Sequence, residues 1–163
     1  MIRPVEKKDA PSICGIYNYY VNNTVVTFEE ASVDMSEMER RIRNITETHP
    51  WYVLEEEGQV LAYAYASPWR VKSAYRFSTE LTVYVDRNSH GRGFGSTLYA
   101  YLIEEMEKRG MHCLYGVIAL PNEPSSRLHE KFGFKKCGHF NQVGYKMERW
   151  IDVGYWEKVR ANV

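Results

Sequence analysis

A glycine-rich stretch near the middle of the chain separates a strand-like segment from a helix-like one. Residues 85–110 read VDRNSHGRGFGSTLYAYLIEEMEKRG, with glycines at 91, 93 and 95. Apolar residues recur at helical spacing from Phe94 to Arg109, and Gly110 then ends the predicted helix. The first N–H groups of a helix have no partner in the chain, and glycines let a ligand approach the backbone. This order favours a site for an anion, although a glycine loop that binds nothing is the alternative interpretation.

Two well-known glycine motifs fit this stretch poorly. A P-loop ends in Gly-Lys-Ser/Thr, whereas Gly95 is followed by Ser96 and Thr97. The dinucleotide-binding fingerprint is G-x-G-x-x-G, but the spacing here is G-x-G-x-G. Three antiparallel-looking strands also precede the loop, which disfavours a Rossmann unit. The remaining segments must therefore identify the fold.

Local patterns predict further elements on both sides of the glycines. Asp9 is the predicted N-cap of a first helix, and Asp34 with Glu37 forms a capping-box pattern for a second helix that ends before Pro50. From Trp51 the period changes to two, which predicts two strands around a turn at Glu57-Gly58 and then a third. The predicted segments are IRPV, WYVLEEEGQVLAYAYASPW and YRFSTELTVYVD before the glycines, and HCLYGVIAL, NEPSSRLHEKF, GFKKCGHF and GYKMERWIDVGYW after them.

The predicted order is therefore β-α-α-β-β-β-α-β-α-β-β. No linker rich in Pro, Gly or Ser divides the chain, so we expect one α+β domain over residues 1–163, with helices covering the faces of a mixed sheet.

Composition excludes several classes of protein. The chain has 163 residues, of which 44% are hydrophobic and 14% aromatic, as in folded globular proteins. Lys plus Arg and Asp plus Glu both number 21 and no long basic block occurs, which argues against nucleic acid or a membrane surface as the partner. Cys14, Cys113 and Cys137 are too widely spaced for a disulfide framework or a zinc site, so no metal is predicted. A charged N-terminus and the lack of long apolar runs favour a soluble, cytoplasmic protein.

Several ordered segments together resemble the GNAT acyltransferases. They are ELTVYVDRNSHGRGFGSTLYAYLIEEMEKRG and VIALPNEPSSRLHEKFGF. Within that superfamily the chain is most similar to the phosphinothricin and methionine sulfoximine N-acetyltransferases, through IYNYYV, AYASPWR and VGYKMERWIDVGYWE. The resemblance implies a GNAT-like fold with a mostly antiparallel sheet, acetyl-CoA as co-substrate, and a small amino-acid-like amine as acceptor.

The resemblance also implies which residues bind the cofactor. The family pattern Gln/Arg-x-x-Gly-x-Gly/Ala corresponds to the run from His90 to Gly95, in which histidine replaces the leading residue. Backbone N–H groups should still hold the pyrophosphate of coenzyme A, and the strand before the loop should present its backbone to the pantetheine arm. The predicted cofactor-binding residues are Val83, Tyr84, Val85, His90, Gly91, Arg92, Gly93, Phe94, Gly95, Ser96 and Asn122. Strand packing for the valines and an N-cap role for Asn122 are alternatives.

Acetyl transfer to an amine requires a base, because amines are mostly protonated at neutral pH. Glu80 lies in an alternating strand, on the face that carries Thr82 and Tyr84, and the subfamily's catalytic glutamate aligns with it. Partial burial would raise the pKa of Glu80 and suit it to accept a proton. The alternative is that Glu80 only lies on a solvated face of the sheet. His129 stands where many GNAT enzymes have a tyrosine that protonates the leaving thiolate. It could act as acid or base, or only pack.

Two segments are predicted to bind the acceptor. Arg70, Lys72 and Arg76, with Tyr75, could bind a carboxylate or phosphinate, and Arg76 is favoured because it is close to Glu80 in sequence. The alternative, especially for Lys72, is that these charged side chains lie in solvent on a loop and bind no acceptor. Phe28 and Glu29 resemble the segment that covers the acceptor in relatives.

The C-terminal aromatic residues fit either core packing or the homodimer interface that is common in the subfamily.

We therefore expect direct transfer from acetyl-CoA to the amine in a ternary complex, without an acetylated enzyme, since no cysteine lies in the site motifs. Two other functions stay open. The acceptor could be a protein amine or polyamine, which an acidic groove would favour and the basic residues 70–76 oppose. A non-catalytic acyl-CoA-binding module is the other alternative, and the presence of both Glu80 and His129 disfavours it.

Overall fold

Seven strands form one sheet in the computed structural model, which describes residues 1–161. The strands and helices are β1 (Ile2–Pro4), α1 (Ala10–Asn23), α2 (Met35–Thr46), β2 (Trp51–Glu56), β3 (Gln59–Pro68), β4 (Ser78–Val85), α3 (Phe94–Lys108), β5 (Cys113–Leu120), α4 (Glu123–Lys131), β6 (Lys135–Lys146) and β7 (Arg149–Val159). Short 3-10 helices cover Lys7–Asp9, Ser73–Tyr75 and Arg87–Ser89. The predicted order of strands and α-helices is confirmed. The last two residues of the predicted domain lie outside the described residues.

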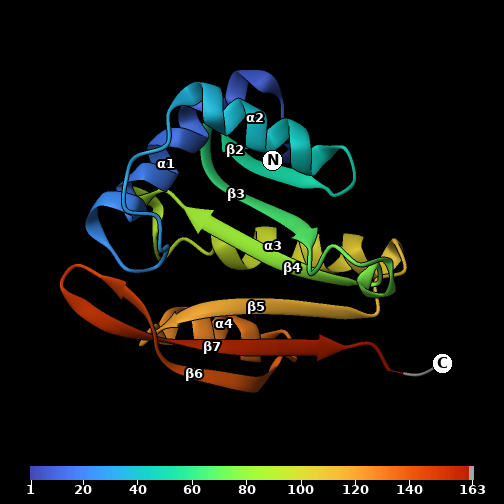
Figure 1. Cartoon of the computed structure of the whole chain (residues 1–163). Helices are drawn as coiled ribbons and strands as arrows, with labels where there is room; N and C mark the ends of the chain where they lie inside the picture. Colours follow the sequence, from blue (N-terminus) through green and yellow to red (C-terminus); the bar gives the residue numbers. More distant parts are fainter. Residues whose placement is uncertain (162–163) are drawn as a thin grey trace.

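The strand order is β1-β2-β3-β4-β5-β7-β6, and of its neighbouring pairs only β4 and β5 run parallel. Figure 1 shows β4 and β5 at the middle of the sheet, with α3 behind them. The prediction of a mixed, mostly antiparallel sheet is confirmed.

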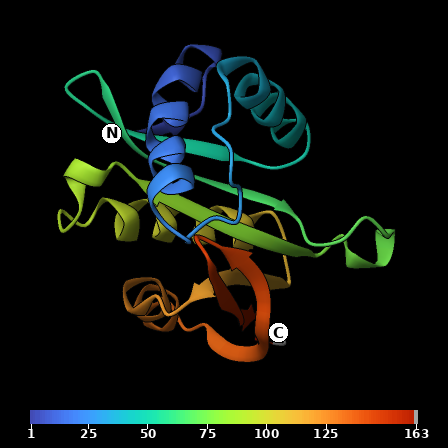
Figure 2. The ribbon, with the colours of Figure 1, turned by 60° about the vertical axis from the view of Figure 1, so that its left-hand side comes forward.

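The sheet separates two apolar cores. One core lies under α1 and α2 and includes Tyr63 and Met38, whereas the other lies under α3 and includes Leu81 and Leu102. In Figure 2 the blue α1 crosses one face of the strands and the yellow-green α3 lies behind the other. Alternation along β4 follows this division, because Leu81 packs in the α3 core while Tyr84 packs against the α1 core. Glu80 therefore belongs to the α1 and α2 side of the sheet.

Local turn and capping signals are mostly confirmed. Glu57 and Gly58 have left-handed φ angles of 51° and 78°, as a tight hairpin between β2 and β3 requires. The Asp34 side chain accepts a hydrogen bond from the Glu37 N–H at 2.8 Å, which caps α2. Asp9, however, stands at the N-cap of α1 without capping it. Its carboxylate instead accepts two hydrogen bonds of 2.8 Å from Arg3 and one of 2.7 Å from the Glu6 N–H, so donors that precede α1 occupy it.

The predicted final strand GYKMERWIDVGYW is wrong as a single element. Met147 and Glu148 have φ angles of 52° and 60° and form a turn, so the chain reverses between β6 and β7. The third predicted strand also begins later than expected, since Ser73–Tyr75 forms a 3-10 helix before β4.

Within the described chain, no helix combines the length and apolar character needed to cross a membrane. All three cysteines are free.

Candidate active site

The parallel strands β4 and β5 part in the middle of the sheet. Their pairing covers only Ser78 with Cys113, Thr79 with Leu114 and Glu80 with Tyr115. Beyond Glu80 they diverge around a cavity of about 370 Å³, which we call the splay cavity. Its walls come from both strands and also from Phe28, Tyr99 and His129. The opening therefore brings together side chains from the two layers that the sheet otherwise separates.

Glu80 lies at the point where this opening begins. Its side chain is partly buried, and burial raises the pKa of the Glu80 carboxyl, while the positive charge of Arg70 partly opposes that rise. The raised pKa agrees with the direction expected from the sequence. A carboxylate in this state binds a proton more readily than one in water, so Glu80 is suited to act as a base.

His129 and Tyr99 form a hydrogen-bonded pair on another wall of the splay cavity. Nδ1 of His129 lies 2.8 Å from the Ser125 carbonyl oxygen, which can only accept, so Nδ1 carries the proton. Nε2 then accepts a hydrogen bond from the Tyr99 hydroxyl at 2.7 Å. Burial lowers the pKa of His129, although the hydrogen bond to Ser125 opposes this shift. The lowered pKa favours the neutral imidazole.

Gly116 of β5 makes room for this pair. A Cβ at position 116 would lie 2.1 Å from Nε2 of His129, well inside any van der Waals contact. The imidazole can therefore occupy its present place only because the strand has no side chain at that position.

The backbone of β4 is exposed to the opening. The Asp86 N–H donates to the Leu61 carbonyl on the β3 side at 2.8 Å. Because the direction of the N–H groups alternates along a strand, those of Val85 and Val83 point the other way, toward β5. The pairing with β5 has already ended there, so this edge can bind an extended ligand. The Val85 carbonyl accepts a hydrogen bond of 2.5 Å from the Tyr20 hydroxyl.

The glycine loop leads directly into α3. Gly91 and Gly93 adopt φ angles of 78° and 79°, a left-handed conformation that side chains disfavour. The first N–H of α3 with a helical acceptor is that of Thr97, which donates to the Gly93 carbonyl at 3.0 Å. The N–H groups of Phe94, Gly95 and Ser96 precede it and lack helical acceptors, so they are available to bind an anion. The loop therefore fits the pyrophosphate of coenzyme A.

Charged and polar side chains surround this loop. Lys131 donates to the Ser96 hydroxyl at 2.8 Å, and Arg92 donates to Glu56 at 2.5 Å. His90 does not point a free side chain at the anion site. Its Nε2 lies 2.8 Å from the Tyr20 hydroxyl, which ties the loop to α1. Tyr20 donates to Val85, so Nε2 of His90 is the donor in this contact.

The loop 24–34 between α1 and α2 covers one end of the splay cavity. Phe28 lines the cavity, and its ring lies on Gly144 of β6, where a Cβ would come within 2.4 Å of it. Glu29 accepts two hydrogen bonds from Arg41, which lower the pKa of Glu29, and a third from Tyr17. Lys146, also on β6, is buried and donates to the Thr27 carbonyl at 2.8 Å. Both α2 and β6 therefore fix this loop in place.

The predicted basic residues lie farther out. Lys72, Tyr75 and Arg76 are exposed and do not line the splay cavity. Arg76 donates to the Ser73 carbonyl, and its guanidinium lies 4.5 Å from the Phe77 ring centre. Arg70 is the member of this segment whose charge acts on Glu80. Asn122 does line the cavity, and it also caps α4 by accepting from the Ser125 N–H at 3.3 Å.

Sequence reasoning missed several residues of the site. Tyr99 falls among the apolar residues that recur at helical spacing from Phe94 to Arg109, and this pattern does not show that its hydroxyl is bonded to His129. Gly116 carried a usable signal, because a glycine inside an apolar strand often marks the close approach of another group. Within residues 1–161, no cluster of three His, Cys, Asp or Glu side chains could hold a metal ion.

Comparison with known proteins agrees with this geometry. The family model described as an acetyltransferase (GNAT) domain matches residues 2–154. A phosphinothricin N-acetyltransferase from Streptomyces viridochromogenes is 39% identical over 157 residues, which cover 96% of this chain and 86% of the relative. An L-methionine sulfoximine/L-methionine sulfone acetyltransferase from Pseudomonas paraeruginosa is 33% identical over 158 residues, covering 96% of this chain and 92% of the relative.

Solved structures show the same fold. A ribosomal-protein-alanine N-acetyltransferase from Brucella melitensis superposes with a TM-score of 0.95 at 39% identity, covering 98% of this chain and 99% of that one. A phosphinothricin acetyltransferase from Sinorhizobium meliloti in complex with acetyl-CoA gives a TM-score of 0.94 at 34% identity, covering 98% and 87%. The predicted resemblance is confirmed: this chain belongs to the GNAT family and is an acetyl-CoA-dependent N-acetyltransferase.

Proposed function

We propose that the chain transfers the acetyl group of acetyl-CoA to the amine of a small amino-acid-like acceptor, of the phosphinothricin or methionine sulfone type. One observation supports this most strongly. A partly buried carboxylate, Glu80, and a buried neutral histidine, His129, line the same cavity. The names of the relatives from Streptomyces viridochromogenes and Pseudomonas paraeruginosa point to the same class of acceptor.

Glu80 is the proposed general base. The acceptor enters as an ammonium ion, which has no lone pair, so one proton must leave before the nitrogen can attack the thioester carbonyl. Burial raises the pKa of Glu80 and thereby strengthens it as a proton acceptor. N–H groups on the open edge of β4 at Val83 and Val85 would polarise the thioester carbonyl.

His129 and Tyr99 are proposed to handle the second proton of the nitrogen. Once the carbon–nitrogen bond has formed, this proton leaves the nitrogen, and the carbon–sulfur bond breaks to give a thiolate that takes up a proton. The Nε2 lone pair of neutral His129 accepts the Tyr99 O–H, so the Tyr99 oxygen can take up a proton from the cavity while its own proton passes to Nε2. The pair can therefore accept the proton and return it to the sulfur.

The other predicted residues complete the proposal. Residues His90 to Ser96 and the β4 backbone hold coenzyme A, with Asn122 beside its arm. Phe28 covers the acceptor and Glu29 positions that cover. The exposed Lys72, Tyr75 and Arg76 would close on the acceptor's acidic group only after it binds.

The test is thiol release from acetyl-CoA over a panel of amines that includes phosphinothricin, methionine sulfone, a polyamine and a peptide with a free N-terminus. We expect the two amino-acid-like amines to give the highest kcat/KM. Binding of acetyl-CoA without acceleration by any amine would refute an acetyltransferase of this substrate class. A stable acetylated enzyme, detected by mass spectrometry without acceptor, would refute direct transfer.

A second candidate acceptor is the N-terminal amine of a protein. It is favoured by the similarity to the Brucella melitensis structure, whose name specifies a ribosomal-protein alanine. The peptide in the amine panel separates the two candidates, because a higher kcat/KM for the peptide would select this one.

We also propose that the chain acts in the cytoplasm as a homodimer. The hairpin of β6 and β7 exposes apolar side chains, with Val143 and Trp150 exposed by 59% and 64%. Sedimentation at micromolar concentration would test this, and a monomer would refute it.

A further inference from the structure

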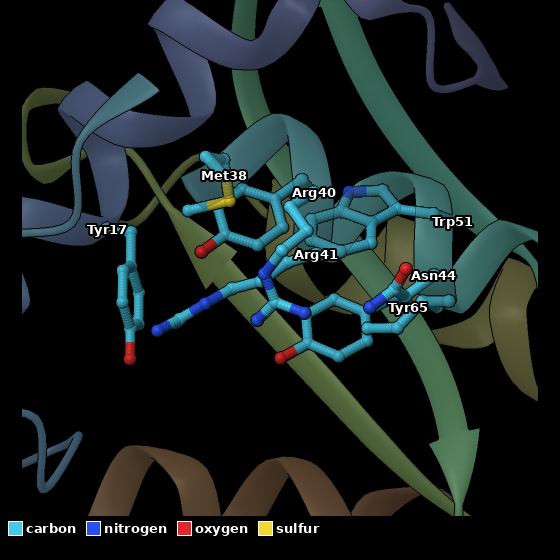
Figure 3. A pocket seen from close by; sticks show the side chains of 9 residues that line it. Tyr17, Met38, Arg40, Arg41, Asn44, Trp51 and Tyr65 are labelled. Atoms are coloured by element: carbon cyan, nitrogen blue, oxygen red, sulfur yellow. The ribbon is translucent and has the colours of Figure 1, made fainter. Parts of the chain in front are cut away.

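A second cavity lies beneath α2, on the same side of the sheet as Glu80. We call it the α2 recess, and its volume is about 220 Å³. Figure 3 looks into it and shows Tyr17 and Tyr65 on either side, with the two arginines of α2 between them.

Flat aromatic surfaces form much of the recess. The Trp51 ring stacks on Tyr65 with centroids 4.2 Å apart and planes within 20°, and the Tyr63 ring is nearly parallel to that of Tyr65. Met38 lines another side, and its flexible side chain adapts to the shape of a ligand. Such walls favour a planar apolar group, because ring stacking adds to the burial of apolar surface.

The charges around the recess cancel. Arg41 donates to Glu29 with both terminal nitrogens and to Glu37 with Nε, and Arg40 also pairs with Glu37. Two guanidinium groups therefore meet two carboxylates. Since the carboxylates bind the N–H edge of Arg41, its flat face is what remains for a ligand, and that face stacks well on an aromatic ring. The occupant should therefore be uncharged at this end.

The recess continues toward the proposed base. Tyr17 and Tyr65 line both the α2 recess and the splay cavity. In the sheet, Tyr65 is in register with Thr82, which shares the Glu80 face of β4. An acceptor whose amine lies at Glu80 can therefore extend past Tyr65 into the recess.

We infer that the α2 recess binds an uncharged aromatic side chain of the acceptor, so that aromatic amino acids are substrates beside the aliphatic ones. This inference rests on the proposed function, because it places the amine at Glu80. The size is adequate, since an apolar cavity of roughly 150 Å³ suffices for benzene.

The test places a bulky side chain at the edge of the recess. Asn44 lines the recess from the exposed surface of α2, so Asn44→Trp adds bulk there without entering the core. We expect kcat/KM for L-phenylalanine to fall about tenfold or more, as burial of a ring side chain implies, while the value for methionine sulfone changes by less than about twofold. Arg43→Trp, at the neighbouring exposed position of α2, which does not line the recess, is the matched control and should leave both values unchanged.

A binding measurement separates this inference from the proposed function. Calorimetry with N-acetyl-L-phenylalanine should detect binding to the wild type and much weaker binding to Asn44→Trp. If methionine sulfone is acetylated but L-phenylalanine is not, the inference is refuted and the proposed function stands. If no amine is acetylated, the proposed function fails. In that case, binding of an aromatic side chain in the recess is supported only if N-acetyl-L-phenylalanine binds the wild type and not Asn44→Trp. Equal binding to both proteins, or no binding to either, refutes it.

Discussion

Replacing Gly116 by alanine tests how closely His129 and β5 are fitted to each other. The new Cβ would lie 2.1 Å from Nε2 and 2.4 Å from Cδ2 of His129, whereas carbon contacts normally lie about 3.5 Å apart. The ring would have to retreat by about 1 Å or more. It cannot do so freely, because Ser125 and Tyr99 hold its two nitrogens at 2.8 and 2.7 Å.

The expected cost combines two effects. Overpacking a core costs about 1–3 kcal/mol, and breaking the bond between buried Tyr99 and His129 costs about 1–3 kcal/mol. The loss of glycine's flexibility in the unfolded chain offsets about 0.4–1 kcal/mol. We therefore expect a net loss of about 2–4 kcal/mol, seen as a fall in Tm of about 5–15 °C. Turnover should fall as well, because the proposed proton relay is displaced.

A double-mutant cycle decides whether this reasoning is right. In a His129→Ala background the imidazole is gone, so Gly116→Ala should cost little or even stabilise the protein. Urea unfolding of the four proteins gives the interaction energy directly. An equal cost of Gly116→Ala in both backgrounds would show that the contact with His129 is not the cause.

Three further predictions concern the base, the glycine loop and the acceptor cover. Glu80→Gln should lower kcat by about 10²–10⁴-fold and leave the Kd of acetyl-CoA nearly unchanged in calorimetry, and an active variant would remove Glu80 from its role. Because burial raises the pKa of Glu80 and a base must be ionised, kcat/KM should rise with pH through that pKa, and the variant should lack this limb. Gly93→Ala, at a φ of 79°, should cost about 1–2 kcal/mol of stability and weaken acetyl-CoA binding severalfold. Gly15→Ala in α1 is the control, and equal binding of acetyl-CoA by the two variants would contradict the anion site. Lys146→Met removes the 2.8 Å bond to the Thr27 carbonyl and should raise the acceptor KM severalfold with little change in kcat, so an unchanged KM would separate that bond from acceptor binding.

Local signals in the sequence were sufficient for the elements but not for their arrangement. The hairpin at Glu57-Gly58 and the cap at Asp34 depend on neighbouring residues, and both were predicted. The turn at Met147-Glu148 was missed because neither residue is typical of a left-handed turn. The parallel pairing of β4 with β5 joins segments separated by the whole of α3, and no local pattern encodes it.

The residues of the candidate site were likewise predicted only where a local pattern indicates them. Alternation along β4 placed Glu80 opposite the buried residues, and the structure shows it lining the splay cavity. Closeness in sequence to Glu80 made Arg76 the favoured residue for binding the acceptor's acidic group, yet Arg76 is exposed and does not line the splay cavity. The charge that acts on Glu80 is that of Arg70. Tyr99 was missed because helical periodicity assigns a residue to the core without saying what its hydroxyl meets there.

The parting of β4 and β5 would serve both the proposed chemistry and the proposed binding of the cofactor. Glu80 faces the layer of α1 and α2, whereas Tyr99 and His129 belong to the layer of α3 and α4, and an unbroken sheet would keep them apart. Where the ladder ends after Glu80, the same opening leaves backbone N–H and carbonyl groups of β4 without strand partners. Buried backbone groups need partners, and the amide-bearing arm of coenzyme A can supply them where a strand would otherwise lie. In the proposed mechanism, the gap through which Glu80 and His129 reach the same cavity is therefore also the place where an extended, amide-rich co-substrate would bind.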